Sequence, residues 1–410
     1  MLYRRSRRVR FLRDVVRICA TVALAACATS ETDRITYSVR DSAGIRIVEN
    51  TGAAWEAGQE WSMTPDPVLR IGSIDGEATY QFYGIRSVDL TEDSGVVVLD
   101  GASAELRRYD ARGSHQWSAG GRGGGPGEFQ QPLYLGRHDD AFLVWDRAAA
   151  RLTIIGARGE TVSTERHVPA TGDPPQAYGV FENGTLLATF PRSIMPPTPG
   201  AILADSVDMW SYDRVTEERQ VLARLPGSVW LWTGRYQLPV PLTTNPLRAI
   251  SGNDLVIAVG AEPVVLRYGR EGELTGRFVL LRSVAAVNSG DAQRVVDFWI
   301  ANDYYGAPET VWREWLDRMP VPQERPAFDR LVVSRARDIW VRRFVLDPES
   351  EPFIWDILSA DGVYLGEINS PPGFEIMAIE GNRVAGIYRD EDGVEYVHVH
   401  ALSRSDRDQR

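Results

Sequence analysis

The histidines are the first side chains to consider for chemistry, because an imidazole can bind a metal ion or transfer a proton near neutral pH. The chain has five, and only His398 and His400 have a suggestive spacing. Two positions apart on a strand, they point to the same face and could supply two metal ligands. No partner carboxylate is identifiable for them, and a packed or solvated pair is the alternative interpretation. The sequence also lacks a G-x-S-x-G elbow, an H-E-x-x-H helix and a C-x-x-C pair, so it predicts no catalytic residue, no metal site and no cofactor.

A glycine-rich segment at residues 120–129 could cradle a phosphate. Such a loop needs a strand before it and a helix after it, so that the helix N-terminus faces the phosphate. Here the chain continues through Pro132 in a strand-like stretch, and the whole sequence contains no lysine. We therefore predict a crossing between repeated units, where bare backbone packs closely.

Aromatic residues are the third candidate group. Trp230 and Trp232 border a loop-rich stretch, 228–246, that also contains Arg235 and Tyr236. Such a loop could stack on a sugar ring, an aromatic ligand or a peptide. The alternative is that a long insertion packs against the rest of the fold. The ligand-binding residues therefore stay unknown at this stage.

The N-terminus has the pattern of an export signal. A basic stretch begins at Arg4 and precedes an apolar run from Ile18 to Ala26. Nine helical residues span about 14 Å, too short for a bilayer core of about 30 Å. The sequence Leu24-Ala25-Ala26-Cys27 resembles the lipobox of bacterial lipoproteins, in which the cysteine is acylated and becomes the new N-terminus. The resemblance implies a signal peptide at residues 1–26 and lipidation of Cys27; the alternatives are cleavage elsewhere or a buried helix.

The net charge of the chain limits the kinds of partner that it can bind. Removal of residues 1–26 takes away seven arginines and one aspartate, which changes the formal net charge from -11 to -17. Such a surface repels nucleic acid and anionic lipid, so we expect no nucleic-acid partner and membrane attachment through the acyl chains alone. One thiol remains, so no internal disulfide can form. We expect a protein of the cell envelope on the periplasmic side. Ala28 is not the Asp that retains some lipoproteins at the inner membrane, which slightly favours the outer one.

From about residue 33 onward, short β-rich runs alternate with Gly, Asp, Asn and Pro. A hydrophobic residue followed four positions later by a turn glycine recurs along the chain. The pairs are Tyr109 with Gly113, Ile155 with Gly159, Tyr268 with Gly272 and Leu358 with Gly362. A further copy at Tyr212 lacks the glycine, so we expect a longer or differently shaped hairpin there.

Each repeat is predicted to be four strands, and six repeats fit within residues 67–402. The sixth has no room for its outer strand. Val68–Ile71 can complete it by pairing beside Tyr396–Leu402, which closes a ring and removes a long unpaired edge. We expect a tether and cap segment at residues 27–66, a short helical insertion at about 289–319 between the fourth and fifth repeats, and a polar tail at 403–410.

The stretch 123–129 resembles the G-x-G-P-G-x-F segment found between blades in bacterial NHL-like six-bladed β-propellers. Residues 41–50 and 326–330 are also similar to exported members of that group. The resemblance implies an all-β fold, a six-bladed β-propeller whose last blade is closed by an N-terminal strand. It implies little about function, because the same ring hosts scaffolds, receptors and enzymes.

These patterns favour a binding or interaction module whose ligand is a protein, a small molecule or a glycan. The alternative is a six-bladed propeller enzyme, either a metal-dependent lactonase-type hydrolase or a lyase. Its carboxylates and Asn or His side chains would converge at the central channel. The sequence cannot place side chains around that channel, so the two classes remain open here.

Overall fold

The computed structural model describes residues 36–56, 58–168, 173–190, 198–243, 245–347 and 353–404. The regular structure in these ranges is mostly β, with strands arranged in six sheets of four to six strands each. Within a sheet, nearly all strands that follow one another in the chain pair as antiparallel neighbours. Each sheet is therefore built largely from one continuous stretch of sequence.

The first three sheets are formed by residues 85–239. The first contains β5 (Ile85–Leu90), β6 (Val96–Asp100), β7 (Glu105–Tyr109) and β8 (His115–Gly120). The second contains β9 (Pro132–His138), β10 (Ala141–Asp146), β11 (Arg151–Ile155) and β12 (Thr161–Arg166). The third contains β13 (Gln176–Val180), β14 (Leu186–Thr189), β15 (Ile202–Tyr212), β16 (Arg219–Trp232) and β17 (Gln237–Pro239).

The other three sheets also include strands from the N-terminal region. The fourth contains β18 (Leu247–Ser251), β19 (Asp254–Val259), β20 (Val264–Tyr268) and β21 (Leu274–Leu280), extended by β2 (Ile45–Asn50) and β1 (Tyr37–Ser42). The fifth contains β22 (Phe328–Val333), β23 (Ile339–Arg343), β24 (Phe353–Leu358) and β25 (Tyr364–Ser370). The sixth contains β26 (Phe374–Glu380), β27 (Arg383–Arg389) and β28 (Glu395–Arg404), extended by β4 (Leu69–Ile71) and β3 (Trp61–Met63).

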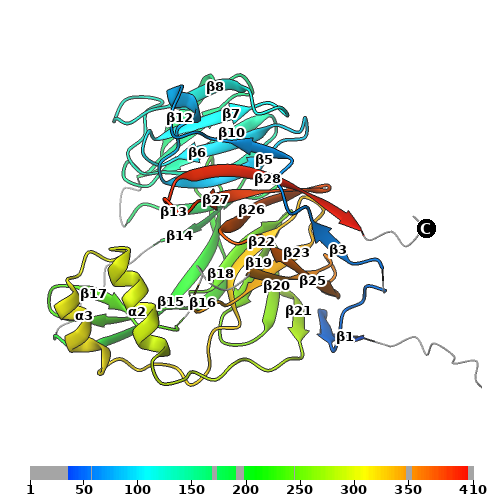
Figure 1. Cartoon of the computed structure of the whole chain (residues 1–410), viewed down its shortest axis with the longest axis vertical. Helices are drawn as coiled ribbons and strands as arrows, with labels where there is room; N and C mark the ends of the chain where they lie inside the picture. The colour runs from blue at the N-terminus through cyan, green and yellow to red at the C-terminus, as the bar shows by residue number, and fades with distance from the viewer. Residues whose placement is uncertain are drawn as a thin grey trace, which may run out of the picture. The chain divides into compact units, whose positions relative to one another are not determined.

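The first strands of the sheets contact one another in a cycle. In chain order, β5, β9, β13, β18, β22 and β26 each contact the next, and β26 contacts β5. A hydrophobic cluster fills the space between each neighbouring pair of sheets, including the last and the first, where Val96 and Val98 meet Ala385 and Val397. This arrangement is propeller-like, and the labels of Figure 1 allow the sheets to be followed in chain order.

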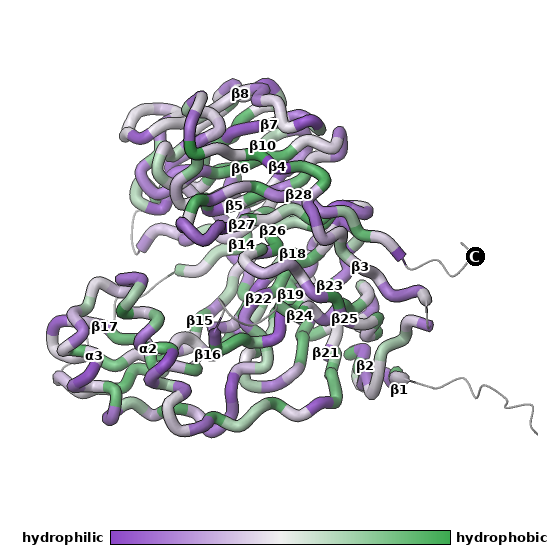
Figure 2. The backbone as a smooth tube through the Cα atoms, viewed as in Figure 1, coloured by the Kyte–Doolittle hydropathy of each residue, from purple (hydrophilic) through white to green (hydrophobic). Residues whose placement is uncertain are grey.

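Burial explains why the second strand of each sheet reads as an apolar run. All five residues of β6, VVVLD, are buried, and so are all four residues of β14. A strand covered on both faces has no solvent side that would select alternating polar residues. Figure 2 shows hydrophobic residues along these inner strands and more hydrophilic residues in the loops.

The expected turn glycines are confirmed. Gly113, Gly159, Gly272 and Gly362 all have φ between +81° and +85°, a region that glycine adopts without a Cβ clash. In these turns a backbone N–H bonds to the carbonyl four residues later, as Asp110 does with Ser114. In the copy without glycine, Asp213 bonds to Glu218, one residue further on, and Glu217 takes the positive φ of 59°. The longer hairpin expected after Tyr212 is therefore present.

The N-terminal strands complete two sheets that are distant in sequence. β4 pairs antiparallel with β28, with Leu69 opposite Val399 and Ile71 opposite Val397, which is the strand pairing expected for Val68–Ile71. Residues 37–50 differ from the expected tether and cap, because β2 pairs parallel with β21 and carries β1 on its outer edge. Parallel pairing between strands so far apart leaves no local signal in the sequence.

Two helices lie between β21 and β22. They are α2 (Asp291–Ala301) and α3 (Glu309–Leu316). Much earlier in the chain, the short 3-10 helix η1 (Ala78–Tyr80) lies ahead of β5. Val296 and Trp312 of the helices are buried against Leu231 and Leu238 of β16 and β17. No helix in the described part of the chain is long and apolar enough to cross a membrane.

Candidate ligand-binding cavity

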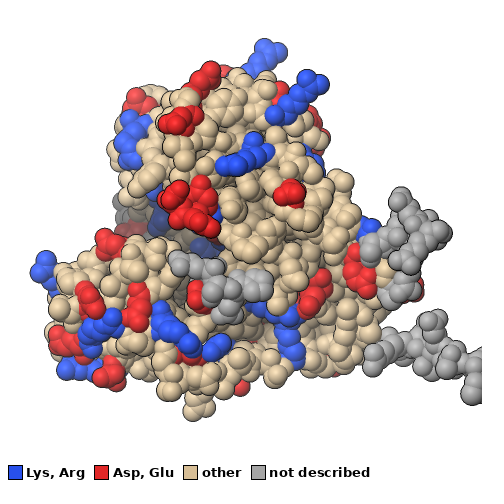
Figure 3. Space-filling model, viewed as in Figure 1, with Lys and Arg blue, Asp and Glu red and all other residues tan. Residues whose placement is uncertain are grey.

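The first strands of all six sheets line one cavity of about 1690 Å³. β15 and β16 extend past the other strands of the third sheet and add residues 205–210, 219, 224, 227, 228 and 230 to its wall. Small-molecule sites usually enclose roughly 300–1,000 Å³, so the space is ample for such a ligand. The described wall includes eight arginines and six aspartates or glutamates, in a chain whose net charge is -11. Figure 3 shows basic and acidic side chains interspersed over the visible outer face.

Paired charges occupy the end of the cavity where the first strands end. Asp89 on β5 accepts a hydrogen bond from the Tyr134 hydroxyl at 2.9 Å. It also forms an ion pair with Arg335 at 3.3 Å. Arg337 forms a second ion pair, 2.9 Å from Glu182. Burial, and then the charge of Asp89, raises the pKa of Tyr134 well above its usual value, so its hydroxyl stays a hydrogen-bond donor. These groups neutralise one another.

Near the other end, where the first strands begin, two arginines have no carboxylate partner among the described residues. The Arg248 guanidinium lies 3.7 Å from the ring centre of Tyr178, a cation–π contact between β18 and β13. Arg147 follows β10, and its Nε donates to the Gln176 side-chain oxygen at 3.1 Å. Burial lowers the pKa of Arg248, and the positive charge of Arg147 lowers it further. Gln176 and Tyr178 lie two positions apart on β13, so the same strand holds both arginines at the cavity wall.

The start of β22 holds a more deeply buried charged group. Burial raises the pKa of Asp329 and lowers that of Arg330 to about 10. Arg342 donates to Asp329 at 2.6 Å, and Arg330 forms an ion pair with Glu375. Each of these charges has a partner of opposite sign, and the Arg330–Glu375 pair links the fifth and sixth sheets.

The two histidines with metal-ligand spacing do not line the cavity. His398 and His400 lie on β28, both buried, and the ring of His398 stacks on Tyr388 with centroids 4.5 Å apart. His400 Nδ1 bonds to the Thr64 carbonyl at 2.8 Å. Within the described ranges, no group of three or more His, Cys, Asp or Glu side chains is arranged to hold a metal ion. The structure therefore places this pair in an aromatic cluster.

The glycine-rich segment connects β8 to β9 and is held by the protein's own polar groups. Phe129 is fully buried, and the Arg151 guanidinium donates to the carbonyls of Gly124 and Glu128. The Glu128 carboxylate accepts from the Gly125 N–H at 2.8 Å. The expected crossing between sheets is therefore present, with a strand and not a helix after it.

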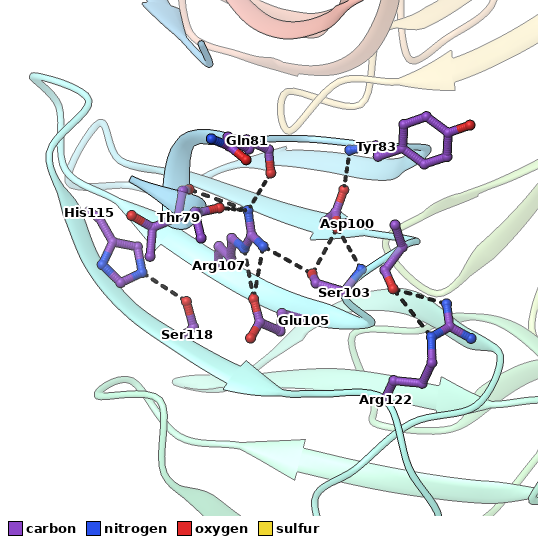
Figure 4. A network of polar contacts seen from close by, with 12 residues as sticks. Thr79, Gln81, Tyr83, Asp100, Ser103, Glu105, Arg107, His115, Ser118 and Arg122 are labelled. Carbon is purple, nitrogen blue, oxygen red and sulfur yellow. Dashed lines mark hydrogen bonds and ion pairs between the residues drawn. The ribbon is translucent and has the colours of Figure 1, made fainter. Parts of the chain in front are cut away.

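An equivalent network precedes the first sheet. Arg107 donates to the carbonyls of Ala78 and Gln81, at 3.1 and 2.9 Å, and Asp100 accepts from the Tyr83 N–H at 2.8 Å (Figure 4). In the second sheet, Asp146 accepts from the N–H groups of Gln130 and Gln131. A buried Asp at the end of the second strand and an Arg on the third thus position the loop that leads into the sheet.

Of the predicted aromatic loop, the structure brings only part to the cavity. Trp230 lines the wall and meets the Tyr305 ring edge-on, with centroids 6.2 Å apart. Trp232, Arg235 and Tyr236 are not among the described lining residues. Cys27, the expected lipidation site, lies outside the described residues.

The arginines of the cavity were missed by reasoning from the sequence. Arg147, Tyr178 and Arg248 lie in or beside three different sheets, and no spacing connects them. In a chain whose basic residues are all arginine, an individual arginine carries no signal. Only the prediction of a repeated ring could have drawn attention to the start of each first strand.

Comparisons with known proteins give structural likeness alone. A protein from Bacteroides fragilis NCTC 9343 named as an exported protein is similar at 10% identity and a TM-score of 0.49, over 87% of this chain and 98% of that one. A member of the DUF4221 family from Bacteroides vulgatus has 9% identity and a TM-score of 0.49, over 85% and 99%. Virginiamycin B lyase from Staphylococcus aureus has 11% identity and a TM-score of 0.43, over 84% and 99%. No family profile matches the sequence, and no curated protein matches it significantly.

Proposed function

We propose that this chain is an exported, lipid-anchored, NHL-like six-bladed β-propeller that binds a ligand in its central cavity. The observation that carries the proposal is the cavity itself, walled by the first strands of all six sheets and lined by charged side chains that are only partly paired. Charged groups that line a partly enclosed space lose solvation, which a bound partner of opposite charge restores. A cavity of this kind is the default location of a ligand site in such a fold.

Three features support the ring of six blades. The first strands contact one another in a closed cycle, hydrophobic clusters lie between all neighbouring sheets, and β4 adds a strand to the sixth sheet. The helices α2 and α3 are then an insertion between the fourth and fifth blades. The glycine-rich crossing between β8 and β9 agrees with the NHL-like stretch at residues 123–129.

Blocking the cavity tests the binding function. Ser87 on β5 lines the wall and lies two positions from Asp89, which faces the cavity. We expect Ser87→Trp to reduce the capture of compounds from the small-molecule fraction of a periplasmic extract, measured by native mass spectrometry of the full-length mature protein. Val162→Trp is the matched control, because Val162 is 62% exposed on the outer strand β12.

The outcomes separate the classes of function. A compound held by wild type and by Val162→Trp but lost from Ser87→Trp supports a ligand site in the cavity. Equal capture by all three proteins, or none by wild type, would reject it. Chemical conversion of the captured compound by wild type would instead support the propeller enzyme.

Anchoring is tested separately at Cys27. We expect wild type to carry a lipid modification and to fractionate with membranes, and Cys27→Ala to lose both properties, because the acyl chains are the proposed membrane contact. Mass spectrometry of the N-terminal peptide and membrane fractionation measure the two effects. Wild type without lipid and in the soluble fraction would contradict the proposal.

A further inference from the structure

The arginines of the cavity wall fall into two groups. Arg137, Arg224, Arg330, Arg335 and Arg337 each have a carboxylate within ion-pair distance. Arg147, Arg219 and Arg248 have none among the described residues. Arg219 lies over the Phe190 ring, 4.0 Å from its centre, and like Arg147 it is exposed. Arg147 and Arg248 are the pair held by one strand, through Gln176 and Tyr178 of β13.

The position of Arg248 is set by an aromatic face. Its guanidinium is 3.7 Å from the centre of the Tyr178 ring, and no hydrogen bond from it to a described residue is present. Stacking on a ring holds the guanidinium plane while leaving its N–H groups free along the edge. Arg147 is held from its own side by Gln176, two residues before Tyr178 on β13. Both guanidinium groups thus retain N–H donors that can reach a ligand.

Burial and like charge make the electrostatics of Arg248 unfavourable. Burial and the charge of Arg147 both lower the pKa of Arg248, and only Tyr178 acts in the opposite direction. The carboxylates of Asp173 and Asp205 also line the cavity, but neither is among the groups that affect Arg248. Arginine remains charged at neutral pH even so, and neither guanidinium has a carboxylate partner among the described residues.

We propose that Arg147 and Arg248 form an oxyanion-binding site in the cavity, and that the ligand is a small molecule carrying a carboxylate or a phosphate group. An oxyanion between the two guanidinium groups replaces their repulsion with two attractions and can accept paired N–H bonds from each. Apolar residues also line the cavity, among them Leu247 next to Arg248, and they suit the uncharged remainder of the molecule. This inference rests on the proposed function, since it assigns the chemistry of the ligand in the same cavity.

The test measures binding of two simple oxyanions. Titration of the mature full-length protein with inorganic phosphate is followed by ³¹P line broadening, and titration with succinate by ligand-observed ¹H NMR. We expect at least one to bind, and Arg147→Gln and Arg248→Gln each to weaken that binding about tenfold or more, the usual effect of losing a charge-assisted bond. The probe that binds decides between phosphate and carboxylate.

Arg70→Gln is the matched control. Arg70 also stacks on a tyrosine, 3.9 Å from the ring centre of Tyr396, has no ion pair with a described residue and lies outside the cavity wall. Its loss changes the net charge by the same amount, so binding within about twofold of wild type is expected. If Arg248→Gln does not fold, Arg248→Lys keeps the charge but not the paired donors, and a smaller loss of binding is expected.

Two results from the titrations of wild type and the arginine variants would overturn the inference. One is the absence of binding of either anion to wild type. The other is an equal effect of Arg70→Gln and Arg248→Gln, which would mean that only net charge matters. Capture of an extract compound that persists in Arg147→Gln/Arg248→Gln but is lost in Ser87→Trp would leave the binding function standing and reject the anion site. Anion binding unaffected by Ser87→Trp would instead place the anions outside the proposed cavity site.

Discussion

At the scale of single residues, the turn glycine Gly272 shows how closely neighbouring sheets approach. It lies between β20 and β21 with φ of +85°, and a Cβ added there would lie 2.4 Å from the carbonyl oxygen of Val221 on β16. A backbone oxygen in a strand cannot move aside as a flexible side chain can. The glycine is therefore needed for two reasons, the positive φ and the contact between the third and fourth sheets.

We predict that Gly272→Ala lowers the free energy of unfolding by about 2–4 kcal/mol, through backbone strain and the forced contact together. Gly44→Ala isolates the first cause, because Gly44 has φ of +83° with nothing within 4 Å of an added Cβ. We expect that variant to lose only about 1 kcal/mol. Urea unfolding of both variants measures the difference, and equal losses would show that the contact between sheets does not matter.

The buried histidines make stability depend on pH. Burial, and then the charges of His400 and Arg70, lowers the pKa of His398 from 6.5 to about 4. The unfolded chain therefore binds more protons than the folded one between these values, so the free energy of unfolding falls as the pH is lowered from about 6.5 to about 4. The contribution is fully present above pH 6.5 and is on the order of 2 kcal/mol.

His398→Phe keeps an aromatic ring beside Tyr388 and removes the titrating group. We expect its midpoint of thermal unfolding to fall less between pH 7 and pH 4.5 than that of wild type. Carboxylates titrate in the same range in both proteins, so the difference between the two curves reports the histidine. Parallel curves would contradict the prediction.

At the scale of elements, α2 and α3 depend on the extended strands of the third sheet. Short helices are marginal alone, and these bury Val296 and Trp312 against Leu231 and Leu238. No described residue of either helix lines the cavity. The geometry therefore favours helices that support β16 and β17, and β16 carries Trp230 to the cavity wall. It favours this role over that of a lid that closes directly on the ligand.

Trp312→Ala tests this dependence. Trp312 is 1% exposed, so its truncation is expected to cost about 3–5 kcal/mol and to increase hydrogen exchange in α2, α3 and β16–β17 first. Trp315→Ala is the comparison, because Trp315 is half-buried and stacks on Arg318, 4.6 Å from its guanidinium. A smaller effect is expected there. Similar exchange in the two variants would contradict the assignment.

At the scale of the whole molecule, the C-terminal strand β28 is joined to strands from the N-terminal region. β28 pairs with β4 and, further along, with β3, where Leu402 lies opposite Met63. The cluster between the last and first sheets includes Ile71 of β4 together with Val397 and Val399. Removing β4 therefore exposes a strand edge and part of this cluster at once.

Two nested deletions separate the contributions of the N-terminal strands. Deletion of residues 28–60 removes β1 and β2, and deletion of 28–72 also removes β3 and β4. We expect the second step to cost several further kcal/mol, because it opens the closure at β28. Thermal unfolding of both proteins and of wild type measures each step. Identical midpoints for the two deletions would contradict the closure by β4.

The sequence by itself determined the strands, their turns and much of their order. Strand runs such as Val96–Leu99 and turn glycines such as Gly113 are local features. A strand buried on both faces shows as a short apolar run, and a turn that needs a positive φ shows as a glycine, so neighbouring positions are enough to predict each. Because the pattern repeats along the chain, the first sheet allowed the others to be predicted. The pairing of Val68–Ile71 with β28 could be predicted because a single incomplete repeat left a single spare strand.

Only the tertiary structure decided the parallel addition of β2 to β21 and the composition of the cavity. Glu49 pairs with Val279, and Arg248 stacks on Tyr178, across sequence separations that no local pattern encodes. The physical reason is that side chains from different sheets meet in the cavity only when they lie at the same depth along its axis. That depth depends on the strand register and the tilt of each sheet. A free arginine therefore becomes recognisable only when every carboxylate around it has been located.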